Sequence, residues 1–422
     1  MSFRKEYTIL IVLLMTGIIF CQTPLLYRGA DLSSLPQIEA AGGEFDVGLG
    51  PEDILTILTA SGFNLVRLRL WHSPADGHYG LEEVTQMCQR IHETGMAILL
   101  DFHFSDTWAD PGHQTPPAVW EGLSSVALAD SIYNYTYHVL DHLQNHDALP
   151  ELVQIGNEIN CGLLWDLGRV CGQYDTPEQW ETLALFLNSA AAAVRSFSFP
   201  DGSTPEIIIH FADGGDYISS TWFFDSTIEY GVDYDHIGLS YYPWWHGSLS
   251  ELAENLDILS LLYDRHVFVL ETAYPWTLAW NDDTHNIIGT EEQLLPGFPA
   301  SPSGQYTFLW HLLQTVASTS SSHGRCVCYW EPAWLSLPES GSALENLNLF
   351  DFEGQALPGL LVFAAGDLNE DGTISILDLV LMVDIILSNE EITPVFWRGD
   401  LNSDGELDVV DLVRLIMVIL SD

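Results

Sequence analysis

The chain has 422 residues, of which 47% are hydrophobic and 17% are charged, so it can bury a large core and is not intrinsically disordered. Its 12 basic and 59 acidic residues give a formal net charge of −47 at pH 7. A surface this acidic repels nucleic acid and anionic membranes, and it suits a neutral substrate better than a polyanionic one.

The N-terminus has the pattern of a signal peptide. Arg4 and Lys5 precede the apolar run 8–20, which is too short to span a bilayer comfortably. We therefore predict a signal peptide over residues 1–22, a secreted protein, and no transmembrane segment in the mature chain. Cys21 leaves lipidation open, although Phe20 does not fit the small residue expected before a lipidated cysteine.

Short runs of β-branched and aliphatic residues alternate with longer, helix-compatible segments in the next part of the chain. They predict eight strands, at residues 27–31, 65–70, 97–104, 152–158, 206–211, 236–242, 267–271 and 326–331. Apolar strands that alternate with helices indicate a parallel sheet covered on both faces, and eight such units suit a closed barrel. The predicted fold class is therefore α/β, with a (β/α)8 TIM barrel over residues 25–363 that we expect to be monomeric.

Polar and aromatic residues gather at the C-terminal ends of these strands, where barrel enzymes keep their active sites. Strand alternation predicts that the polar residues face the barrel interior and their apolar neighbours face the helices. The inward residues are Arg67, Arg69, Asp101 and His103, and the outward ones are Val66, Leu68, Leu70, Leu100 and Phe102. Glu158 and Glu271 end the fourth and seventh strands, which lie across a closed barrel from each other. Cleavage of a glycosidic bond needs one carboxylic acid and a second carboxylate, so these two glutamates are the candidate catalytic pair. For either glutamate alone, an ion pair with an arginine would be the preferred explanation.

Seven segments between residues 25 and 363 resemble the motifs of glycoside hydrolase family 53, the endo-β-1,4-galactanases. They are GAD at 29–31, VRLRLW at 66–71, DFHFSDTWADP at 101–111, GNE at 156–158, IGLSYYP at 237–243, ETAYP at 271–275 and YWEP at 329–332. The resemblance implies a retaining mechanism with Glu158 as acid/base and Glu271 as nucleophile, their carboxylates about 5 to 5.5 Å apart. Glu158 must start protonated, so we expect the charge of Glu271 and partial burial to raise its pKa.

Three residues are expected to assist this pair. The resemblance to barrel glycosidases implies that Asn157 binds the 2-hydroxyl of the sugar. Arg67 and Tyr242 face inward, where a charge-assisted bond and a hydroxyl donor can hold Glu271 ionised and oriented. Structural support of the barrel interior is the alternative for both residues.

Three further residues are candidate contacts with the sugar. His103 is either a hydrogen-bond donor to the substrate or a histidine whose partners lie within the barrel. Trp108 and Trp330 sit at predicted strand ends and offer flat faces for stacking, although any one of the 14 tryptophans is more often part of a core.

Residues 366–422 form a separate module with an internal repeat of 33 residues, in which GDLNEDG at 366–372 returns as GDLNSDG at 399–405. Oxygen-bearing side chains fall at positions 1, 3, 5, 9 and 12 of each loop, the spacing of an EF-hand calcium site. The candidate ligands are Asp367, Asn369, Asp371, Ser375 and Asp378 in the first loop, and Asp400, Asn402, Asp404, Asp408 and Asp411 in the second.

Two departures separate this module from a calmodulin-like pair. Asp replaces the usual Glu at position 12, and no convincing helix precedes the first loop. With the repeat length and the apolar helices expected at 377–387 and 410–420, the module resembles a type I dockerin. The resemblance implies a small all-α module, two calcium ions, and a cohesin partner on a scaffold or cell-surface protein such as that of a cellulosome.

The remaining cysteines and one loop carry weaker signals. Cys161 and Cys171 lie close enough in sequence to close a disulfide after export, which the sequence leaves open. Cys326 and Cys328 share one side of a predicted strand, so we expect them to pack rather than to bridge each other. The loop 281–286 carries oxygen ligands that would suit a further calcium ion, with an ordinary polar turn as the alternative.

Three functions are consistent with the sequence. The first is a secreted endo-β-1,4-galactanase that acts on arabinogalactan without a catalytic cofactor and docks to a cohesin. The second is a related barrel endo-glycanase acting on mannan, xylan or cellulose, since fold and catalytic pair alone do not determine the sugar. The third is a non-catalytic carbohydrate-binding barrel. The run SDTWADP at 105–111 favours the first over the second, and the two glutamates argue against the third.

Overall fold

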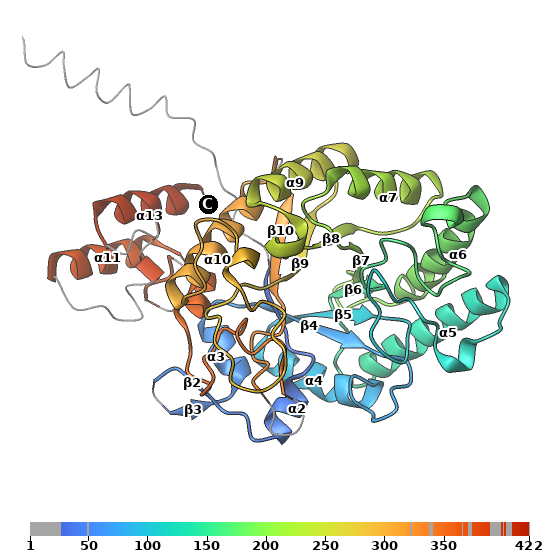
Figure 1. Ribbon diagram of the computed structural model, residues 1–422, viewed down its shortest axis with the longest axis horizontal. Coiled ribbons are helices and arrows are strands. Elements are labelled where there is room, and N and C mark those ends of the chain that lie inside the picture. The colour runs from blue at the N-terminus through green and yellow to red at the C-terminus, as the bar shows by residue number, and fades with distance from the viewer. Residues whose placement is uncertain are drawn as a thin grey trace, which may run out of the picture.

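A computed structural model describes residues 27–48, 50–320, 323–336, 341–364, 366–369, 374–388, 398–399, 401 and 407–421, without the side chains of 417, 418, 420 and 421. Its largest part is a closed barrel of parallel strands with helices around it (Figure 1). The predicted signal peptide and Cys21 lie outside the described residues. No helix within the described part of the chain is long and apolar enough to cross a membrane.

Eight parallel strands close the barrel in chain order, because β10 pairs with β1 as each other strand pairs with the next. They are β1 (Tyr27–Asp31), β4 (Leu65–Leu70), β5 (Ala97–Phe102), β6 (Leu152–Ile155), β7 (Glu206–Phe211), β8 (His236–Ser240), β9 (Val267–Thr272) and β10 (Gly324–Tyr329). A small antiparallel pair, β2 (Phe45–Asp46) and β3 (Pro51–Glu52), lies outside the barrel. The fold class predicted from the sequence is confirmed.

Four barrel strands end earlier than predicted. The backbone turns into the left-handed region at Phe104 (φ 49°) after β5, at Gly156 (φ 89°) after β6 and at Glu331 (φ 47°) after β10. After β8, helix α8 begins at Pro243. A left-handed residue breaks the extended backbone, so the polar residues that we placed at these four strand ends lie in the first turn beyond each strand. Glu271, in contrast, lies within β9.

Helices follow most of the barrel strands and cover the barrel from outside (Figure 1). They are α2 (Leu35–Ala40), α3 (Ile54–Ala60), α4 (Leu81–Thr94), α5 (Ser125–Gln144), α6 (Pro177–Val194), α7 (Tyr217–Glu229), α8 (Pro243–His246), α9 (Leu249–Tyr263) and α10 (Pro302–Ala317). Short 3-10 helices are η1 (Ala118–Trp120), η2 (Gly172–Tyr174), η3 (Glu291–Gln293) and η5 (Pro358–Ala364). Thr176 and Ser301 cap α6 and α10, and proline follows each cap, which is the favoured start of a helix.

The barrel interior changes from apolar to polar along the strands. One cluster of buried side chains fills its lower part: Leu65, Leu99, Leu152, Ile208, Phe268, Leu270, Cys326 and Cys328. Two residues further along their strands, the inward positions carry Arg67, Asp101, Gln154 and His210, all buried. Cys326 and Cys328 are free and packed in this interior, as the sequence predicted. The apolar floor therefore supports a polar layer at the C-terminal ends of the strands.

The C-terminal module lies beside the barrel near α10 and contributes helices α11 (Ile376–Ser388) and α13 (Val409–Ser421), which contact each other (Figure 1). Met382 and Leu415 are buried in it. Arg398 is buried and donates a hydrogen bond to the carbonyl oxygen of Ala60, at the end of α3. The helices predicted after each calcium loop are thus present.

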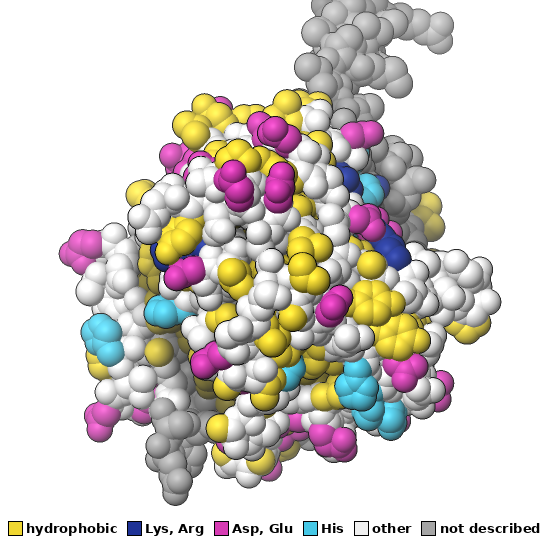
Figure 2. Space-filling view, turned by 90° about the vertical axis from the view of Figure 1, so that its right-hand side faces the viewer, with side chains coloured by type: hydrophobic (Ala, Val, Ile, Leu, Met, Phe, Trp, Pro, Cys, Tyr) yellow, Lys and Arg dark blue, Asp and Glu magenta, His cyan; other side chains and the backbone are white. Residues whose placement is uncertain are grey.

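On the face of the molecule that Figure 2 shows, acidic side chains are spread out rather than gathered into one patch. On the face that Figure 2 shows, Asp and Glu are scattered among polar and apolar side chains, and Lys and Arg appear in only a few places. This distribution is typical of an acidic surface that serves solubility.

Candidate active site

A cavity of about 430 Å³ opens at the C-terminal ends of the barrel strands. It brings together all eight residues that we singled out as catalytic or substrate-binding: Arg67, His103, Trp108, Asn157, Glu158, Tyr242, Glu271 and Trp330. They come from β4, β9 and the turns after β5, β6, β8 and β10, so they converge only because the barrel closes. Their convergence makes this cavity the candidate active site.

Glu271 projects from β9 and is held at both carboxylate oxygens. Arg67 Nη1 lies 2.9 Å from Oε1, and the hydroxyl of Tyr242 donates a hydrogen bond of 3.1 Å to Oε2. Burial raises the pKa of Glu271, and the ion pair with Arg67 and the bond from Tyr242 oppose that rise. The two contacts that the sequence predicted for Glu271 are therefore present.

Arg67 is 1% exposed and serves more than one carboxylate. Its guanidinium also lies 2.8 Å from Asp31 Oδ2 and 2.8 Å from Asp101 Oδ2. Nε donates to Gln154 Oε1 at 3.1 Å. These carboxylates raise the pKa of Arg67 against the effect of burial, so the cation is permanent. Asp31 and Asp101 fix its plane, which in turn fixes the position of Glu271.

Glu158 lies in the turn after β6, where its own φ is 47°. Burial raises the pKa of Glu158 to about 8, and the nearby charge of Glu271 adds to the effect. The hydroxyl of Ser240 donates a hydrogen bond of 2.5 Å to Oε1, which lowers this pKa in part. Arg67 pairs with Glu271 and not with Glu158. We therefore expect Glu158 to be protonated and Glu271 to be ionised at neutral pH. From the sequence we expected both burial and the charge of Glu271 to raise the pKa of Glu158, and burial is the larger of these two causes.

His210 and Ser240 were missed by the sequence reasoning. Since the Ser240 proton is directed to Glu158, the 3.0 Å contact from His210 Nε2 to Ser240 Oγ must use the proton of His210. Burial holds the pKa of His210 well below its usual value, so the ring is neutral and carries its proton on Nε2. The inward alternation of Ile208 and His210 along β7 was the signal that could have found His210.

Asn157 precedes Glu158 and is fixed by the protein on both sides of its amide. Its Oδ1 accepts a 2.8 Å hydrogen bond from Arg67 Nη2, and its Nδ2 donates a 2.8 Å bond to the carbonyl oxygen of Ala109. Among the described residues the second Nδ2 proton has no acceptor, and Asn157 lines the cavity. The amide therefore has a fixed orientation beside the two glutamates.

His103 lines the cavity, but both of its ring nitrogens contact the protein. The backbone N–H of Ala109 donates to Nδ1 at 3.2 Å, so the ring proton is on Nε2, which lies 3.0 Å from Asp101 Oδ2. Of the two roles considered for His103, the geometry therefore favours a histidine whose hydrogen-bond partners lie within the barrel over a hydrogen-bond donor to the sugar.

Aromatic side chains form much of the cavity wall. Trp108 is 39% exposed, and its ring centre lies 6.4 Å from that of Trp330. The sequence reasoning did not select Trp244 and Trp245 of α8, which also line the cavity, and Trp245 is 62% exposed. Exposed indole rings at a cavity rim can stack against the C–H faces of a sugar.

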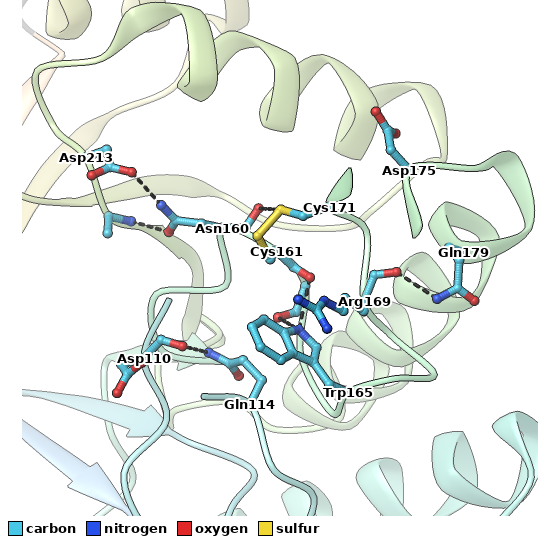
Figure 3. The surroundings of a disulfide bond; sticks show 12 residues. Asp110, Gln114, Asn160, Cys161, Trp165, Arg169, Cys171, Asp175, Gln179 and Asp213 are labelled. Atoms are coloured by element: carbon cyan, nitrogen blue, oxygen red, sulfur yellow. Dashed lines mark hydrogen bonds between the residues drawn. A yellow bond between two sulfur atoms is a disulfide. The ribbon is translucent and has the colours of Figure 1, made fainter. Parts of the chain in front are cut away.

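The loop after Glu158 is secured by a disulfide and by side-chain amides (Figure 3). Cys161 and Cys171, whose pairing the sequence left open, are bridged. Asn160 accepts a 2.7 Å bond from the backbone N–H of Ala212 and donates a 3.0 Å bond to Asp213 Oδ2. Gln114 donates a 2.8 Å hydrogen bond to the carbonyl oxygen of Asn157. These bonds tie the turn that carries Glu158 to the neighbouring loops.

The loop 281–286 behaves as a polar turn. Asp282 Oδ1 accepts from the backbone N–H of Thr284 at 2.5 Å, and Oδ2 accepts from the Ser336 hydroxyl and the Ser342 N–H, both at 2.7 Å. Within the described residues, no group of three or more His, Cys, Asp or Glu side chains is arranged to hold a metal. Because the protein itself satisfies this carboxylate, the geometry favours the polar turn over the further calcium site that we considered.

The C-terminal loops are described only in part. Asp371, Asp400, Asn402 and Asp404 lie outside the described residues. Both position-12 aspartates are fully buried: Asp378 accepts hydrogen bonds from the backbone N–H groups of Leu368 (2.8 Å), Asn369 and Ser375, and Asp411 accepts from Asp408 N–H (2.9 Å). In the described part of each loop, the last aspartate therefore accepts backbone N–H groups of its own loop, and the oxygen-bearing side chains that the sequence places there are of the kind that a hard cation such as calcium prefers.

Comparisons with known proteins identify the family of each part of the chain. Residues 27–363 match Glycosyl hydrolase family 53, and residues 365–420 match the Dockerin type I domain. An arabinogalactan endo-beta-1,4-galactanase from Cellvibrio japonicus is 39% identical over 350 residues, covering 80% of this chain and 90% of that protein. Another from Thermothelomyces thermophilus is 36% identical, covering 80% of this chain and 99% of that protein. The GH53 catalytic domain of Ignisphaera aggregans is 35% identical with a TM-score of 0.74, covering 81% and 98% of the two chains. The chain is therefore a glycoside hydrolase that belongs to glycosyl hydrolase family 53 and carries a C-terminal type I dockerin domain.

Proposed function

We propose that this chain is an endo-β-1,4-galactanase that hydrolyses internal β-1,4-galactosidic bonds of arabinogalactan with retention of configuration. The names of the relatives support the substrate. The observation that supports catalysis most directly is that Glu158 and Glu271 line one cavity while only Glu271 is paired with Arg67. This asymmetry gives the two carboxyl groups different charges and therefore different roles.

In the first step, protonated Glu158 donates its proton to the glycosidic oxygen, and an ionised Glu271 oxygen attacks the anomeric carbon. The bond from that carbon to the leaving oxygen breaks, and a glycosyl ester forms on Glu271. A pKa of about 8 keeps Glu158 protonated at neutral pH. The retaining mechanism requires the two carboxyl groups to lie about 5 to 5.5 Å apart, which remains a prediction for this pair.

In the second step, water hydrolyses the ester. Once Glu271 is esterified, its negative charge no longer raises the pKa of Glu158, so Glu158 can act as a base. It takes a proton from water as the water oxygen attacks the anomeric carbon, and the Glu271 carboxylate is released. Arg67 and Tyr242 stabilise that carboxylate as leaving group. No metal or organic cofactor takes part.

The substrate is held by side chains around the same cavity. The free Nδ2 proton of Asn157 is the donor for the sugar 2-hydroxyl, and Trp108 and Trp330 provide stacking surfaces. These assignments predict that Asn157→Ala lowers kcat more than it raises KM, because bonds to the 2-hydroxyl strengthen in the transition state.

The test of this function is release of reducing sugar from purified β-1,4-galactan, with mannan, xylan and cellulose assayed in parallel. We expect release from galactan alone, and its loss in Glu271→Ala. Activity on another of these glycans would identify the related endo-glycanase instead. Activity on none, from folded protein, would favour the carbohydrate-binding barrel.

We further propose that residues 366–422 bind two calcium ions and attach the barrel of residues 25–363 to a cohesin. Type I dockerins generally bind calcium, and in this chain the ligands would be the ten oxygen-bearing residues named for the two loops. Residues 1–22 would direct secretion, so that the enzyme works outside the cell or on its surface. The test of attachment is binding of the intact chain to cohesin domains in calcium and in chelator.

Calcium should stabilise the C-terminal module far more than the barrel. Clustered carboxylates repel one another without the cation, so we expect chelation to unfold residues 366–422 while the barrel persists. A thermal scan of the full chain should then lose or lower one transition and keep the other. Two unchanged transitions in chelator would contradict the calcium proposal.

A further inference from the structure

Arg69 lies beneath Trp108 in the wall of the cavity. Its guanidinium carbon is 4.3 Å from the centre of the Trp108 ring and 4.4 Å from the centre of the Tyr79 ring. A planar guanidinium attracts aromatic faces at this distance and restricts how the rings can turn. Arg69 is 1% exposed, whereas Trp108 keeps 39% of its surface exposed. One part of the indole is therefore fixed from below while another remains open to the cavity.

Glu331 and Ser34 hold Arg69 in this place. Arg69 Nη2 lies 2.6 Å from Glu331 Oε1 and donates to Ser34 Oγ at 2.7 Å. The backbone N–H and the hydroxyl of Ser34 donate to Glu331 Oε1 at 3.1 and 2.9 Å. Ser34 and Glu331 are themselves buried. The guanidinium plane is thus set by polar contacts from two separate segments of the barrel rim, which are also bonded to each other.

The aromatic wall continues from Trp108 towards the proposed nucleophile. The ring centres of Trp108 and Trp330 are 6.4 Å apart, and those of Trp330 and Tyr242 are 6.4 Å apart. Tyr242 then donates its hydroxyl to Glu271. A sugar unit stacked on Trp108 would therefore lie along the same wall as the reacting unit, and a tilt of Trp108 would displace the chain to be cleaved.

We propose that Arg69, held by Glu331, is a positioning residue that orients Trp108 as a sugar-stacking surface. This inference rests on the proposed function, because it assigns Trp108 to substrate binding. Arg69 acts through the indole ring and takes no part in proton transfer or attack at the anomeric carbon. Its loss should weaken binding of substrate and transition state alike, which raises KM and leaves kcat nearly constant.

The first experiment compares Arg69→Lys with wild type on β-1,4-galactan. Lysine keeps the charge opposite Glu331 but lacks the planar face that stacks on Trp108. We expect KM to rise by about three- to tenfold, within the range of a cation–π contact, with kcat within about twofold of wild type. An unchanged KM in a folded variant would overturn the proposal, as would a fall in kcat with KM constant.

A double-mutant cycle distinguishes positioning from general support of the fold. In a Trp108→Ala background, Arg69→Lys should have no further effect on KM, because the ring that it orients is gone. A general structural role predicts the same rise in KM in both backgrounds. Equal effects in the two backgrounds would therefore contradict the proposal.

Glu331→Gln provides a second route if Arg69→Lys does not fold. Glutamine preserves the shape of Glu331 and removes its charge, so Arg69 is held less firmly and KM should rise by a smaller factor, again only when Trp108 is present. If wild type does not hydrolyse galactan, the proposed function fails, and the same cycle is run on whichever of mannan, xylan or cellulose it does hydrolyse. Hydrolysis of none of these contradicts both proposals.

Discussion

Strand β4 carries two buried arginines, each paired with a glutamate, and the two pairs differ in what surrounds them. Arg67 lies 2.9 Å from Glu271, and Arg69 lies 2.6 Å from Glu331. Glu271 lines the cavity together with a second glutamate, Glu158. Glu331 is not among the described residues that line the cavity. The ion pair with a buried arginine is common to both glutamates, so it is not what singles out Glu271 as the proposed catalytic carboxylate. Glu271 is distinguished by its access to the cavity and by the second carboxyl group, Glu158, that lines the same cavity.

The electrostatic settings of the two glutamates are similar in kind. Burial raises the pKa of Glu271, and it raises the pKa of Glu331 to about 7, while the paired arginine opposes the rise in each case. The remaining partners differ. Tyr242 donates one hydroxyl to Glu271, and Ser34 donates both its N–H and its hydroxyl to Glu331. The Glu331 carboxylate therefore accepts more hydrogen bonds from the protein than Glu271 does, whereas the Glu271 carboxylate faces the cavity, where a substrate can reach it.

The largest expected difference comes from removing each carboxylate charge. Glu271→Gln should lower kcat by about 10⁴-fold or more, because the nucleophile is lost. Glu331→Gln should act mainly on KM, through Arg69 and Trp108. Kinetics of both variants on galactan provide the comparison, with circular dichroism to check the fold. A loss of kcat in Glu331→Gln as large as in Glu271→Gln would break the distinction between the pairs.

Replacing each arginine by lysine should give the next largest contrast. Arg67→Lys cannot reach Asp31, Asp101 and Glu271 at once, so Glu271 loses orientation and kcat should fall by about 10- to 100-fold. Arg69→Lys should instead raise KM. Steady-state kinetics measure kcat and KM separately. A fall in kcat in Arg69→Lys as large as in Arg67→Lys would show that both arginines act on the chemical step.

Tyr242→Phe should have a smaller effect that sharpens the role of Glu271. The variant removes one hydrogen bond to the Glu271 carboxylate and keeps the aromatic wall. A bond to a charged group contributes about 1.5 to 3 kcal/mol, and because this bond is long at 3.1 Å we expect the lower end of that range, a fall in kcat of about tenfold. Phenylalanine at the neighbouring Tyr241, whose hydroxyl donates to the Gly247 carbonyl, is the matched control. Similar losses of kcat in both variants would argue against a specific role for Tyr242.

The smallest expected effect is a shift of the pH profile. With the pKa of Glu158 at about 8, kcat/KM should fall by about tenfold per pH unit above that value as the acid ionises. The Ser240 hydroxyl stabilises the ionised form, so Ser240→Ala should raise the pKa and move the alkaline limb to higher pH. The measurement is kcat/KM from pH 5 to 10. A limb that stays in place, or moves to lower pH, would contradict this account.

Hydrophobic periodicity and the strand-end residues were enough to predict the barrel. Eight apolar runs became eight strands, and alternation correctly separated Arg67 and Asp101 from Val66 and Leu100. The ends of β5 and β10 were misjudged because Phe104 and Glu331 are left-handed, a conformation that a phenylalanine or a glutamate rarely adopts and that a local pattern does not predict. At the end of β6 the left-handed residue is Gly156, which was a local signal for the turn.

The parts of the site that sequence could not predict depend on distances across the barrel. The same alternation that selected Arg67 also placed Arg69 inward, but only the structure brings Arg69 against Trp108. For His103 the sequence left two roles open, and only the structure shows that Ala109 N–H and Asp101 contact its two ring nitrogens. The disulfide likewise required the loop geometry that brings Cys161 and Cys171 together.

The anomeric form of the first product tests the proposal that Glu158 and Glu271 act by double displacement. Proton NMR of a galacto-oligosaccharide digest, followed from the first minutes, distinguishes the anomers before they equilibrate. We expect the β-anomer of the new reducing end to appear first and the α-anomer to follow by mutarotation. Initial appearance of the α-anomer would mean inversion, and it would contradict the assignment of Glu271 as nucleophile.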